Sequence, residues 1–464
     1  MEKMAGVDEA MDRLVELYDA AAARAAEIFR EGTYEDYREV TYPRLEVEVT
    51  RWRPIDRRAP FGYVDEAGRY AAELSRPALL RGYFTEQLTE LAGNYPCEIF
   101  VGPSTTRIPP EYLRGLENVD EARRAGDLGE EVPRPTLDEV DDGIVDSRWE
   151  AFHGPVKPLF HFGPQRFDIA CARIEHYTGI AVETLQKYIL FTNYPMHTTE
   201  FVNLGLRELG REGSRYTRLV LPNGRRITDS SQEIDTASAR QMPRYDLCTE
   251  SGDGISMINI GVGPSNAKTI TDCLAVLRPE AWIMIGHCAG LDARMRMGDL
   301  ILGNAYQRED HLLDRRIARD VPIPAVPEIQ RALESSVTDI YGNDKSLMRT
   351  GTVLSTDDRN WEWRTTRELW EWLRGSTAVA VDMESCTLAA NGYRYRVPYG
   401  TLLSVSDLPL HAVPKLPAQA QAFYSSSKAA HVMCAVRAME YLAHDPRRLR
   451  TRKLRRTIGE VPLR

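Results

Sequence analysis

Two apolar segments in the C-terminal half of the chain are each followed directly by a carboxylate. The segments are Val379-Ala-Val-Asp-Met-Glu-Ser385 and Leu403-Ser-Val-Ser-Asp-Leu-Pro409. A buried acid costs free energy unless it is paired or used. Structural acids such as helix caps are common. Two acids at the ends of strands in one sheet nevertheless favour acid/base chemistry or the binding of sugar hydroxyls.

A glycine-rich turn precedes a helical pattern in Ile258-Asn-Ile-Gly-Val-Gly-Pro-Ser-Asn-Ala-Lys268. The free backbone N–H groups at the start of such a helix suit a phosphate or a hydroxyl. A G-x-G turn also occurs for backbone freedom alone, so a purely structural turn remains open. The spacing matches neither G-x-G-x-x-G nor a Walker P-loop, which disfavours a dinucleotide-binding or ATP-hydrolysing protein.

A third segment, Ile285-Gly-His-Cys-Ala-Gly-Leu291, combines small residues with His287 at an expected strand end. Small residues let a ligand approach the backbone, whereas a packed turn with a buried histidine is the structural alternative. The nine histidines show no H-x-x-x-H or H-E-x-x-H pattern, and the seven cysteines show no C-x-x-C spacing. We therefore predict no catalytic metal, and cysteines that are reduced thiols.

Short Val/Ile/Leu runs come before these segments and are expected to be the strands that position them. The runs lie at 255–261, 281–286, 299–303, 378–382 and 400–405, and several of them are separated by stretches of helix length. Strands that are apolar on both faces predict an α/β sheet covered by helices, with ligands beyond the carboxyl ends of the strands.

The N-terminal part of the chain has a different sequence pattern. It shows helical periodicity at 8–30 and about 78–92, strand patterns at 45–52 and 97–102, and proline-rich loops from 103 to 164. These patterns predict an α+β domain. Because 464 residues exceed one ordinary core, we expect two domains, 1–175 and 176–464.

Composition excludes several classes of protein. No stretch resembles a membrane span or a signal peptide, so we expect a soluble cytoplasmic protein without membrane contacts. The net charge of −9 disfavours a nucleic-acid binder. The basic tail 446–456 is interpreted as a solvated charged face, or as a segment that binds an anionic ligand or the acidic surface of a neighbouring subunit.

Several segments resemble the AMP nucleosidase family: GVGPSNAK, MIGHCAGL, RTGTVLSTDDRNWE, VDMESCTLAANGYRYRVPYGTLLSVSD and the terminal RKLR. Further segments, RGYFTEQLTEL, VGPST and HYTGI with FTNYPMH, are similar to that family's N-terminal region. The resemblance implies an N-glycosidase that hydrolyses AMP to adenine and ribose 5-phosphate without a cofactor.

The family's catalytic part is similar to purine nucleoside phosphorylases. This implies a nucleoside phosphorylase-like α/β domain on a mixed, partly closed sheet flanked by helices, and a homo-oligomer, expected to be a hexamer. The N-terminal domain would then be regulatory, with MgATP as an allosteric activator and inorganic phosphate as an inhibitor.

The resemblance also assigns catalytic roles. Asp407 matches the acid that protonates N7 of the purine, and Met383 with Glu384 matches the pair that holds the ribose. Protonation at N7 improves the leaving group, and general acid catalysis supplies ~10²–10⁴-fold. Glu384 would accept hydrogen bonds from the 2′- and 3′-hydroxyls, contacts that strengthen as the ring becomes cationic.

Two positions depart from the phosphorylase pattern. Asn266 and Met284 stand where bacterial hexameric phosphorylases carry arginines that grip phosphate. Loss of these charge-assisted contacts makes water the expected nucleophile. His287 would help to position that water, or it is structural.

The remaining candidates are substrate-binding residues. Asn193, Tyr194 and His197 are candidates for the 5′-phosphate because of their donor groups, or they stabilise a loop. Arg359 and Trp361 would cover or stack on the purine, with core packing as the alternative for Trp361. The glycine-rich turn and the third segment would contribute Gly261, Gly263, Ser265, Asn266, Gly286 and Cys288. A purine nucleoside phosphorylase and a non-enzymatic nucleotide sensor remain as alternatives.

Overall fold

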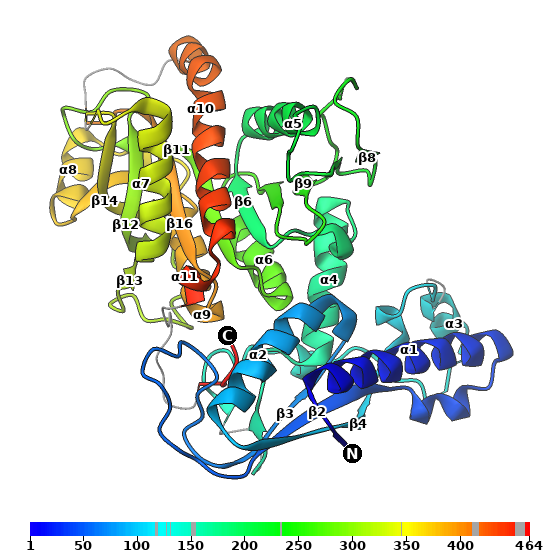
Figure 1. The fold of residues 1–464 in the computed structure, drawn as a ribbon. Coiled ribbons are helices and arrows are strands. Elements are labelled where there is room, and N and C mark those ends of the chain that lie inside the picture. The colour runs from blue at the N-terminus through cyan, green and yellow to red at the C-terminus, as the bar shows by residue number, and fades with distance from the viewer. Residues whose placement is uncertain are drawn as a thin grey trace. The chain divides into compact units, whose positions relative to one another are not determined.

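The computed structural model describes residues 1–116, 119–126, 128–129, 131–149, 155–232, 234–344, 346–410, 417–450 and 460–464 (Figure 1). These residues form two compact units, which are described separately. Unit 1 contains Met1–Arg173, Val276–Arg278 and the described C-terminal residues 460–464; unit 2 contains the rest.

The end of the chain groups with unit 1, although the sequence analysis placed every residue after 175 in the second domain. Backbone hydrogen bonds account for this grouping. The N–H of Gly62 donates to the carbonyl of Pro462 over 2.8 Å. The N–H of Arg464 donates to the side chain of Gln87 over 2.7 Å.

Unit 1 is an α+β unit built on a five-stranded sheet. The strands are β1 (Glu2–Met4), β2 (Thr41–Val49), β3 (Gly68–Glu73), β4 (Cys97–Arg107) and β5 (Lys157–Pro158), in the order β1-β4-β2-β3-β5. All neighbours are antiparallel except β3 and β5. Helix α1 (Val7–Glu31) packs on β2 and β4 beside α2 (Arg81–Asn94). Two further helices are α3 (Val119–Ala125) and α4 (Pro164–Thr178), and the division between the units falls within α4.

Unit 2 is built on a large mixed sheet. Its path is β13-β12-β14-β15-β11-β6-β10-β9-β7-β8, and β16 pairs with both β11 and β12. The bounds are β6 Tyr188–Thr192, β7 Arg218–Val220, β8 Arg226–Ile227, β9 Arg244–Cys248, β10 Ile255–Asn259, β11 Ala281–Gly290, β12 Leu300–Glu309, β13 Ile323–Pro324, β14 Met348–Thr356, β15 Ala378–Asp382 and β16 Tyr399–Asp407.

Part of this sheet closes on itself. Strand β16 runs parallel to β11 and antiparallel to β12, while β12, β14, β15 and β11 pair in succession. These five strands therefore form a closed circuit, and the outer strands continue from β11 as an open extension. The predicted mixed, partly closed sheet is confirmed.

Helices cover the sheet of unit 2. Helices α5 (Pro195–Leu209), α7 (Pro327–Tyr341) and α10 (Pro417–His444) pack together, with α10 against both of the others. Helices α6 (Pro264–Leu274) and α9 (Ser385–Tyr395) pack against each other. Helix α8 (Thr366–Arg374) starts at the capping box of Thr365, and α11 (Arg447–Arg450) is a short basic turn.

Most predicted elements match, with informative differences. The strand predicted at 281–286 continues to Gly290, because β16 keeps pairing with β11 through Cys288. His287 and Cys288, which lie beyond the predicted strand, are therefore inside the observed one. Strand β14 was not singled out as a strand, since its sequence MRTGTVLST is half polar.

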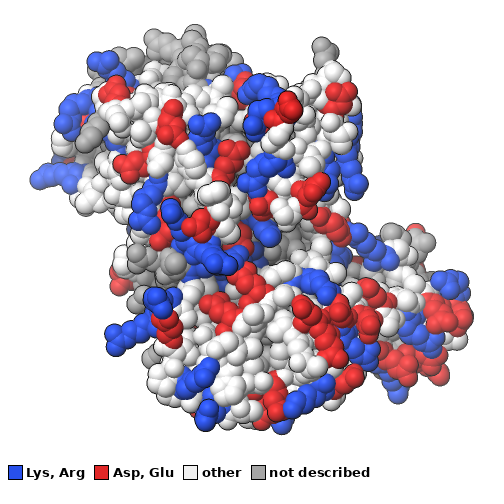
Figure 2. Space-filling view, in the orientation of Figure 1, with Lys and Arg blue, Asp and Glu red and all other residues white. Residues whose placement is uncertain are grey.

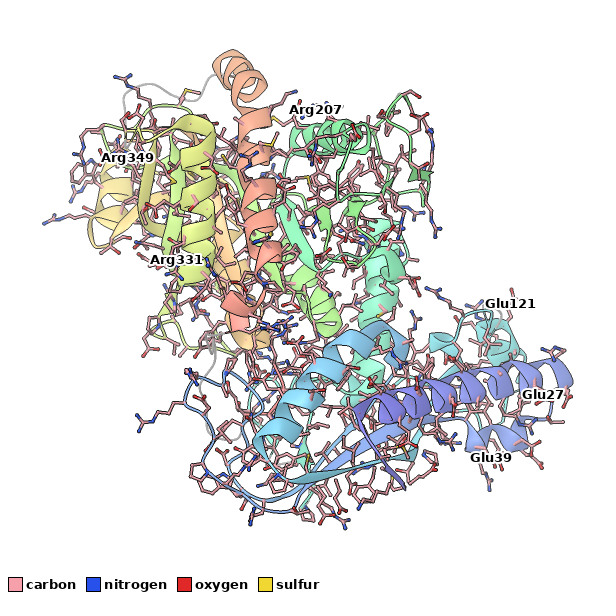
Figure 3. All side chains as sticks on the ribbon, viewed as in Figure 1. Glu27, Glu39, Glu121, Arg207, Arg331 and Arg349 are labelled. Atoms are coloured by element: carbon pink, nitrogen blue, oxygen red, sulfur yellow. The ribbon has the colours of Figure 1, made fainter. Side chains whose placement is uncertain are left out.

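Charged side chains are scattered over the face of the molecule drawn in Figure 2. On the face drawn in Figure 2, acidic and basic groups are interspersed. Arg207 on α5 and Arg331 on α7, labelled in Figure 3, are exposed. Among the described helices, none has the length and apolar character needed to span a membrane.

Candidate active site

The candidate residues gather where parallel strands end. Strands β10, β6, β11 and β16 lie side by side, and each neighbouring pair is parallel. Their carboxyl ends therefore meet at one edge of the sheet, where α/β proteins bind ligands. The segments after β10 and β6 contribute Gly263 and Asn193, and β11 and β16 contribute their own residues. The connection after β15 contributes Glu384, which hydrogen bonds join to the first two segments.

Glu384 lies in the connection between β15 and α9 and is only 2% exposed. Its two carboxylate oxygens have separate donors. The Gly263 N–H donates to Oε1 over 2.6 Å, and the Asn193 Nδ2 group donates to Oε2 over 3.3 Å. Glu384 thus joins the glycine-rich turn, the end of β6 and the start of α9.

Burial and the nearby Asp382 carboxylate raise the pKa of Glu384 to about 8, against the opposing effect of its two donors. The side chain therefore keeps a proton more readily than an ordinary glutamate. A group poised in this way can change its charge when ribose hydroxyls approach.

Asp382, at the end of β15, was quoted within the strand-end segment but was not proposed as a site residue. Its Oδ1 accepts a hydrogen bond from the Ser355 hydroxyl over 2.5 Å, and its Oδ2 accepts from the Ser385 N–H over 3.0 Å. Burial raises its pKa, and these serine donors oppose the rise. Asp382 thereby fixes the first turn of α9 directly after Glu384.

The glycine-rich turn brings a backbone donor to Glu384. Gly261 and Gly263 have φ angles of +67° and +118°, which residues with a side chain rarely adopt. Pro264 then occupies the first position of α6, where its missing N–H is not needed. Ser265 is exposed, and the Asn266 amide turns back to the Val262 carbonyl over 3.5 Å.

Asn193 packs over the backbone of β11. A Cβ atom added at Gly286 would lie 3.0 Å from its Oδ1, so glycine leaves room for this close approach. Asn193 was a candidate for the 5′-phosphate or for stabilising a loop, and its amide donates to the carboxylate predicted to hold the ribose. The backbone at Gly286 is therefore approached by a side chain of the protein itself.

Two aromatic side chains pack against His287. Its ring centroid lies 4.3 Å from that of Tyr194 and 5.4 Å from that of His197. The ring of His197 also packs edge-on against His431 of α10, at 5.2 Å. Sequence reasoning missed His431, because no motif connects it with the other histidines.

These histidines lie deep in unit 2. His197 is hydrogen-bonded through Nδ1 to the Thr192 hydroxyl over 2.7 Å. Burial, with His431, His287 and Lys428 nearby, holds its pKa well below the usual range. Burial also lowers the pKa of His431 to about 4, although its hydrogen bond to the Leu402 carbonyl opposes the shift. Both imidazoles are therefore neutral near pH 7.

Asp407 is the last residue of β16 and is 8% exposed. The Ser406 hydroxyl donates to its Oδ1 over 2.5 Å, and Ser406 also contacts the carbonyl of Cys288. The register pairs Asp407 with Ala289 on β11, one residue past Cys288. The acid therefore stands at the same strand-end edge as His287.

The purine candidates lie after β14. Arg359 is exposed. Trp361 is buried in an apolar cluster with Leu354, Leu369 and Val381, among others, and its ring packs edge-on against Trp372. Met383, beside Glu384, is half-buried. The position of Trp361 is that of a core side chain, and its stacking role stays a prediction.

Within the described part of the chain, no group of three His, Cys, Asp or Glu side chains is arranged to hold a metal ion. The absence of a catalytic metal stays a prediction. The seven cysteines are free thiols, six of them buried.

Two family models match the chain. Residues 9–156 match the bacterial AMP nucleoside phosphorylase N-terminus, and residues 229–442 match the phosphorylase superfamily. With the partly closed mixed sheet and its strand-end site, these matches give unit 2 a nucleoside phosphorylase-like fold.

An AMP nucleosidase of Escherichia coli strain K12 is 43% identical over 437 residues, which cover 91% of this chain and 89% of that protein. The chain belongs to the AMP nucleosidase family. A guanosine phosphorylase of Halorubrum lacusprofundi is 24% identical over 201 residues, covering 42% of this chain and 80% of that protein. A solved AMP nucleosidase from Bacteroides thetaiotaomicron is 25% identical, covers 60% of this chain and 98% of that one, and has a TM-score of 0.45.

Proposed function

We propose that this protein hydrolyses the N-glycosidic bond of AMP to give adenine and ribose 5-phosphate. The observation that carries the proposal is the buried Glu384 carboxylate, held by Gly263 and Asn193, with the acid Asp407 at the same strand-end edge. Membership of the AMP nucleosidase family supplies the substrate. The reaction class follows from the two carboxylates, because C–N cleavage needs a proton on the purine and stabilisation of a cationic ribose.

Asp407 acts as the general acid to N7 of the purine. It is the last residue of β16 and is 8% exposed, so its carboxyl lies at the strand end, next to where a bound base would lie. The Ser406 hydroxyl donates to Oδ1 of this carboxyl and orients it, and the protonated carboxyl then donates its proton to N7.

Glu384 binds the 2′- and 3′-hydroxyls. The pKa of this buried carboxyl is raised, and it falls when two hydroxyls donate hydrogen bonds to the carboxylate. The negative charge that Glu384 then carries stabilises the positive charge that develops on the ribose ring. Met383 provides an apolar floor beside it.

Water is the nucleophile. Asn266 directs its amide to its own turn, and Met284 is fully buried within β11, so neither position supplies a cation for phosphate. His287 helps to place the water, with Tyr194 and His197 packed against its ring. A phosphorylase is the second candidate, since the matching family models carry that name.

The 5′-phosphate binds near the start of α5, where Tyr194 and His197 lie. His197 is neutral, so it would contribute a hydrogen bond rather than a charge. Arg359 is exposed and free of the core, so it can cover the bound purine from solvent.

We also propose a cytoplasmic homohexamer, activated by MgATP through the N-terminal unit and inhibited by inorganic phosphate. Family resemblance supports each of these properties, and the free cysteines suit a reducing compartment. Titration of AMP turnover with MgATP and with phosphate, together with sedimentation, tests them.

The decisive experiment uses ¹⁸O-labelled water. Incorporation of ¹⁸O into ribose 5-phosphate during adenine release in phosphate-free buffer, with no requirement for added phosphate, is the expected result. Release of ribose 1,5-bisphosphate only when phosphate is present would establish phosphorolysis instead. Binding of AMP without release of adenine under any condition would establish a nucleotide sensor.

A further inference from the structure

Helices α6 and α9 both begin at the Glu384 carboxylate. Helix α6 starts at Gly263, whose N–H donates to Glu384 Oε1, and α9 starts at Ser385, the next residue after Glu384. One hydrogen bond thus joins the N-termini of two packed helices. Its geometry depends on how these helices are held farther along their length.

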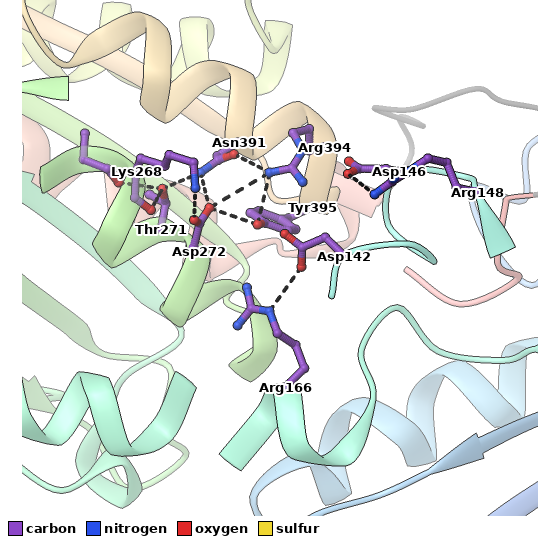
Figure 4. Close-up of polar contacts among 11 residues, drawn as sticks. Asp142, Asp146, Arg148, Arg166, Lys268, Thr271, Asp272, Asn391, Arg394 and Tyr395 are labelled. Atoms are coloured by element: carbon purple, nitrogen blue, oxygen red, sulfur yellow. Dashed lines mark hydrogen bonds and ion pairs between the residues drawn. The ribbon is translucent and has the colours of Figure 1, made fainter. Parts of the chain in front are cut away.

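About two turns from that hydrogen bond, Asn391 of α9 reaches across to α6 (Figure 4). Its side-chain amide donates to the Thr271 hydroxyl over 2.9 Å and to Asp272 Oδ1 over 2.8 Å. Asn391 and Thr271 are both completely buried. The two helices are therefore linked by an amide that is shielded from water.

Other groups fix Asn391 and Asp272 in place. The Asn391 Oδ1 atom accepts from Arg394 over 3.0 Å, and Asp272 Oδ1 also accepts from the Tyr395 hydroxyl over 3.0 Å. Lys268 pairs with the second oxygen of Asp272. We call Asn391, Thr271, Asp272, Arg394 and Tyr395 the α6–α9 clasp.

The clasp resists displacement because its members are interdependent. The Thr271 hydroxyl donates its proton to the Ala267 carbonyl over 2.6 Å. Its oxygen therefore acts as the acceptor toward the Asn391 amide. A shift of either helix would leave buried donors and acceptors unsatisfied, which is costly. An apolar contact between the helices would tolerate sliding more easily.

We propose that Asn391 is a positioning residue that holds the Gly263 N–H on Glu384 and so sets the geometry of the ribose-binding carboxylate. Asn391 follows Glu384 by seven residues, and Thr271 follows Gly263 by eight. At ~1.5 Å per residue, the clasp lies ~10–12 Å from the hydrogen bond that it controls. The inference rests on the proposed function for the role of Glu384, but the linkage itself does not.

The test uses a variant that replaces the hydrogen bonds between the helices with a repulsive contact. Asn391→Asp keeps the shape of the side chain and the oxygen that accepts from Arg394, but it turns a second oxygen toward Asp272 and Thr271. Thr271→Val and Thr271→Ser form a milder matched pair, because only serine keeps the hydroxyl. Tyr216→Phe serves as the control, since it removes a hydrogen bond to Glu440 that lies outside the clasp.

Hydrogen–deuterium exchange over residues 260–268 gives a readout that does not require turnover. In Asn391→Asp and Thr271→Val, we expect the Gly263 amide to exchange at least about tenfold faster, and in Thr271→Ser and Tyr216→Phe at close to the wild-type rate. Unchanged exchange in Asn391→Asp and Thr271→Val, or equally faster exchange in Tyr216→Phe, would overturn the proposal.

Kinetics on AMP then test the consequence. For Asn391→Asp we expect kcat to fall about 10- to 100-fold with a smaller change in KM, because contacts to the ribose strengthen in the transition state. A kcat within twofold of wild type would overturn the positioning role. If the wild-type protein released no adenine from AMP, the proposed function would fail, whereas the exchange experiment would still decide on the clasp.

Discussion

The Glu384→Gln variant should be less stable than the wild-type protein at acidic pH and more stable than it at alkaline pH. Burial, and then Asp382, raise its pKa from the ordinary 4.5 to about 8. Between these values the folded chain keeps a proton that the unfolded chain has released. The stabilisation is therefore fully present below pH 4.5 and is lost as the pH rises through about 8.

The size of this loss follows from the difference between the two pKa values. At ~1.36 kcal/mol per pKa unit, the wild-type protein loses about 5 kcal/mol of unfolding free energy across this range. Glutamine carries no charge at any pH, so residue 384 of the variant causes no such decrease in unfolding free energy as the pH rises.

Glutamine has its own cost. Its single side-chain oxygen cannot accept from both Gly263 and Asn193, so one donor faces an NH₂ group, at about 1–3 kcal/mol. Glu384→Gln should therefore be less stable than wild type by that amount at pH 4.5, and more stable by about 2–4 kcal/mol above pH 8.

Urea unfolding at several pH values, followed by tryptophan fluorescence, measures this difference. Trp282 is buried in β11 of unit 2 and reports on the unit that holds Glu384. A difference between variant and wild type that stays within about 1 kcal/mol from pH 4.5 to pH 9 would refute the electrostatic reasoning. Adenine release should be greatly reduced in the variant at every pH.

Three further substitutions have defined outcomes. Asn193→Ala removes one donor from Glu384, so kcat on AMP should fall about tenfold and the pH limb reporting Glu384 should move to higher pH; an unchanged pH profile would argue against the contact. Gly263→Ala should lower the unfolding free energy by about 1–3 kcal/mol because its φ of +118° is unfavourable for alanine, and an unchanged Tm would contradict this. Arg244→Met should cost about 3–5 kcal/mol in thermal unfolding, since it leaves Asp246 buried without its cation, while turnover per folded molecule stays at the wild-type level; a neutral effect on Tm would show that the pair adds nothing.

The sequence predicted that two carboxylates would follow apolar strands, since each apolar run ends in an acid. Asp407 and Glu384 each follow such a run, and both lie at strand ends in the structure. The closure of the sheet could be predicted only by resemblance, because pairing of β16 with both β11 and β12 leaves no periodic signal in the sequence.

Contacts distant in the chain were the main omission. Gly286 was predicted to admit a ligand, but the side chain that approaches it belongs to Asn193. His431, 234 residues after His197, packs on its ring without any shared motif. Asp382 lies only two residues before Glu384, yet its role depends on Ser355 from another strand. Such partners are defined by tertiary packing rather than by local pattern.

Adenine release by wild type and by Asp407→Asn in phosphate-free buffer tests whether Asp407 drives phosphate-independent cleavage of AMP. We expect steady release of adenine by the wild-type protein and a rate about 10²–10⁴-fold lower in the variant, with an unchanged Tm. Equal rates for the two proteins, or no release by the wild type until phosphate is added, would contradict it.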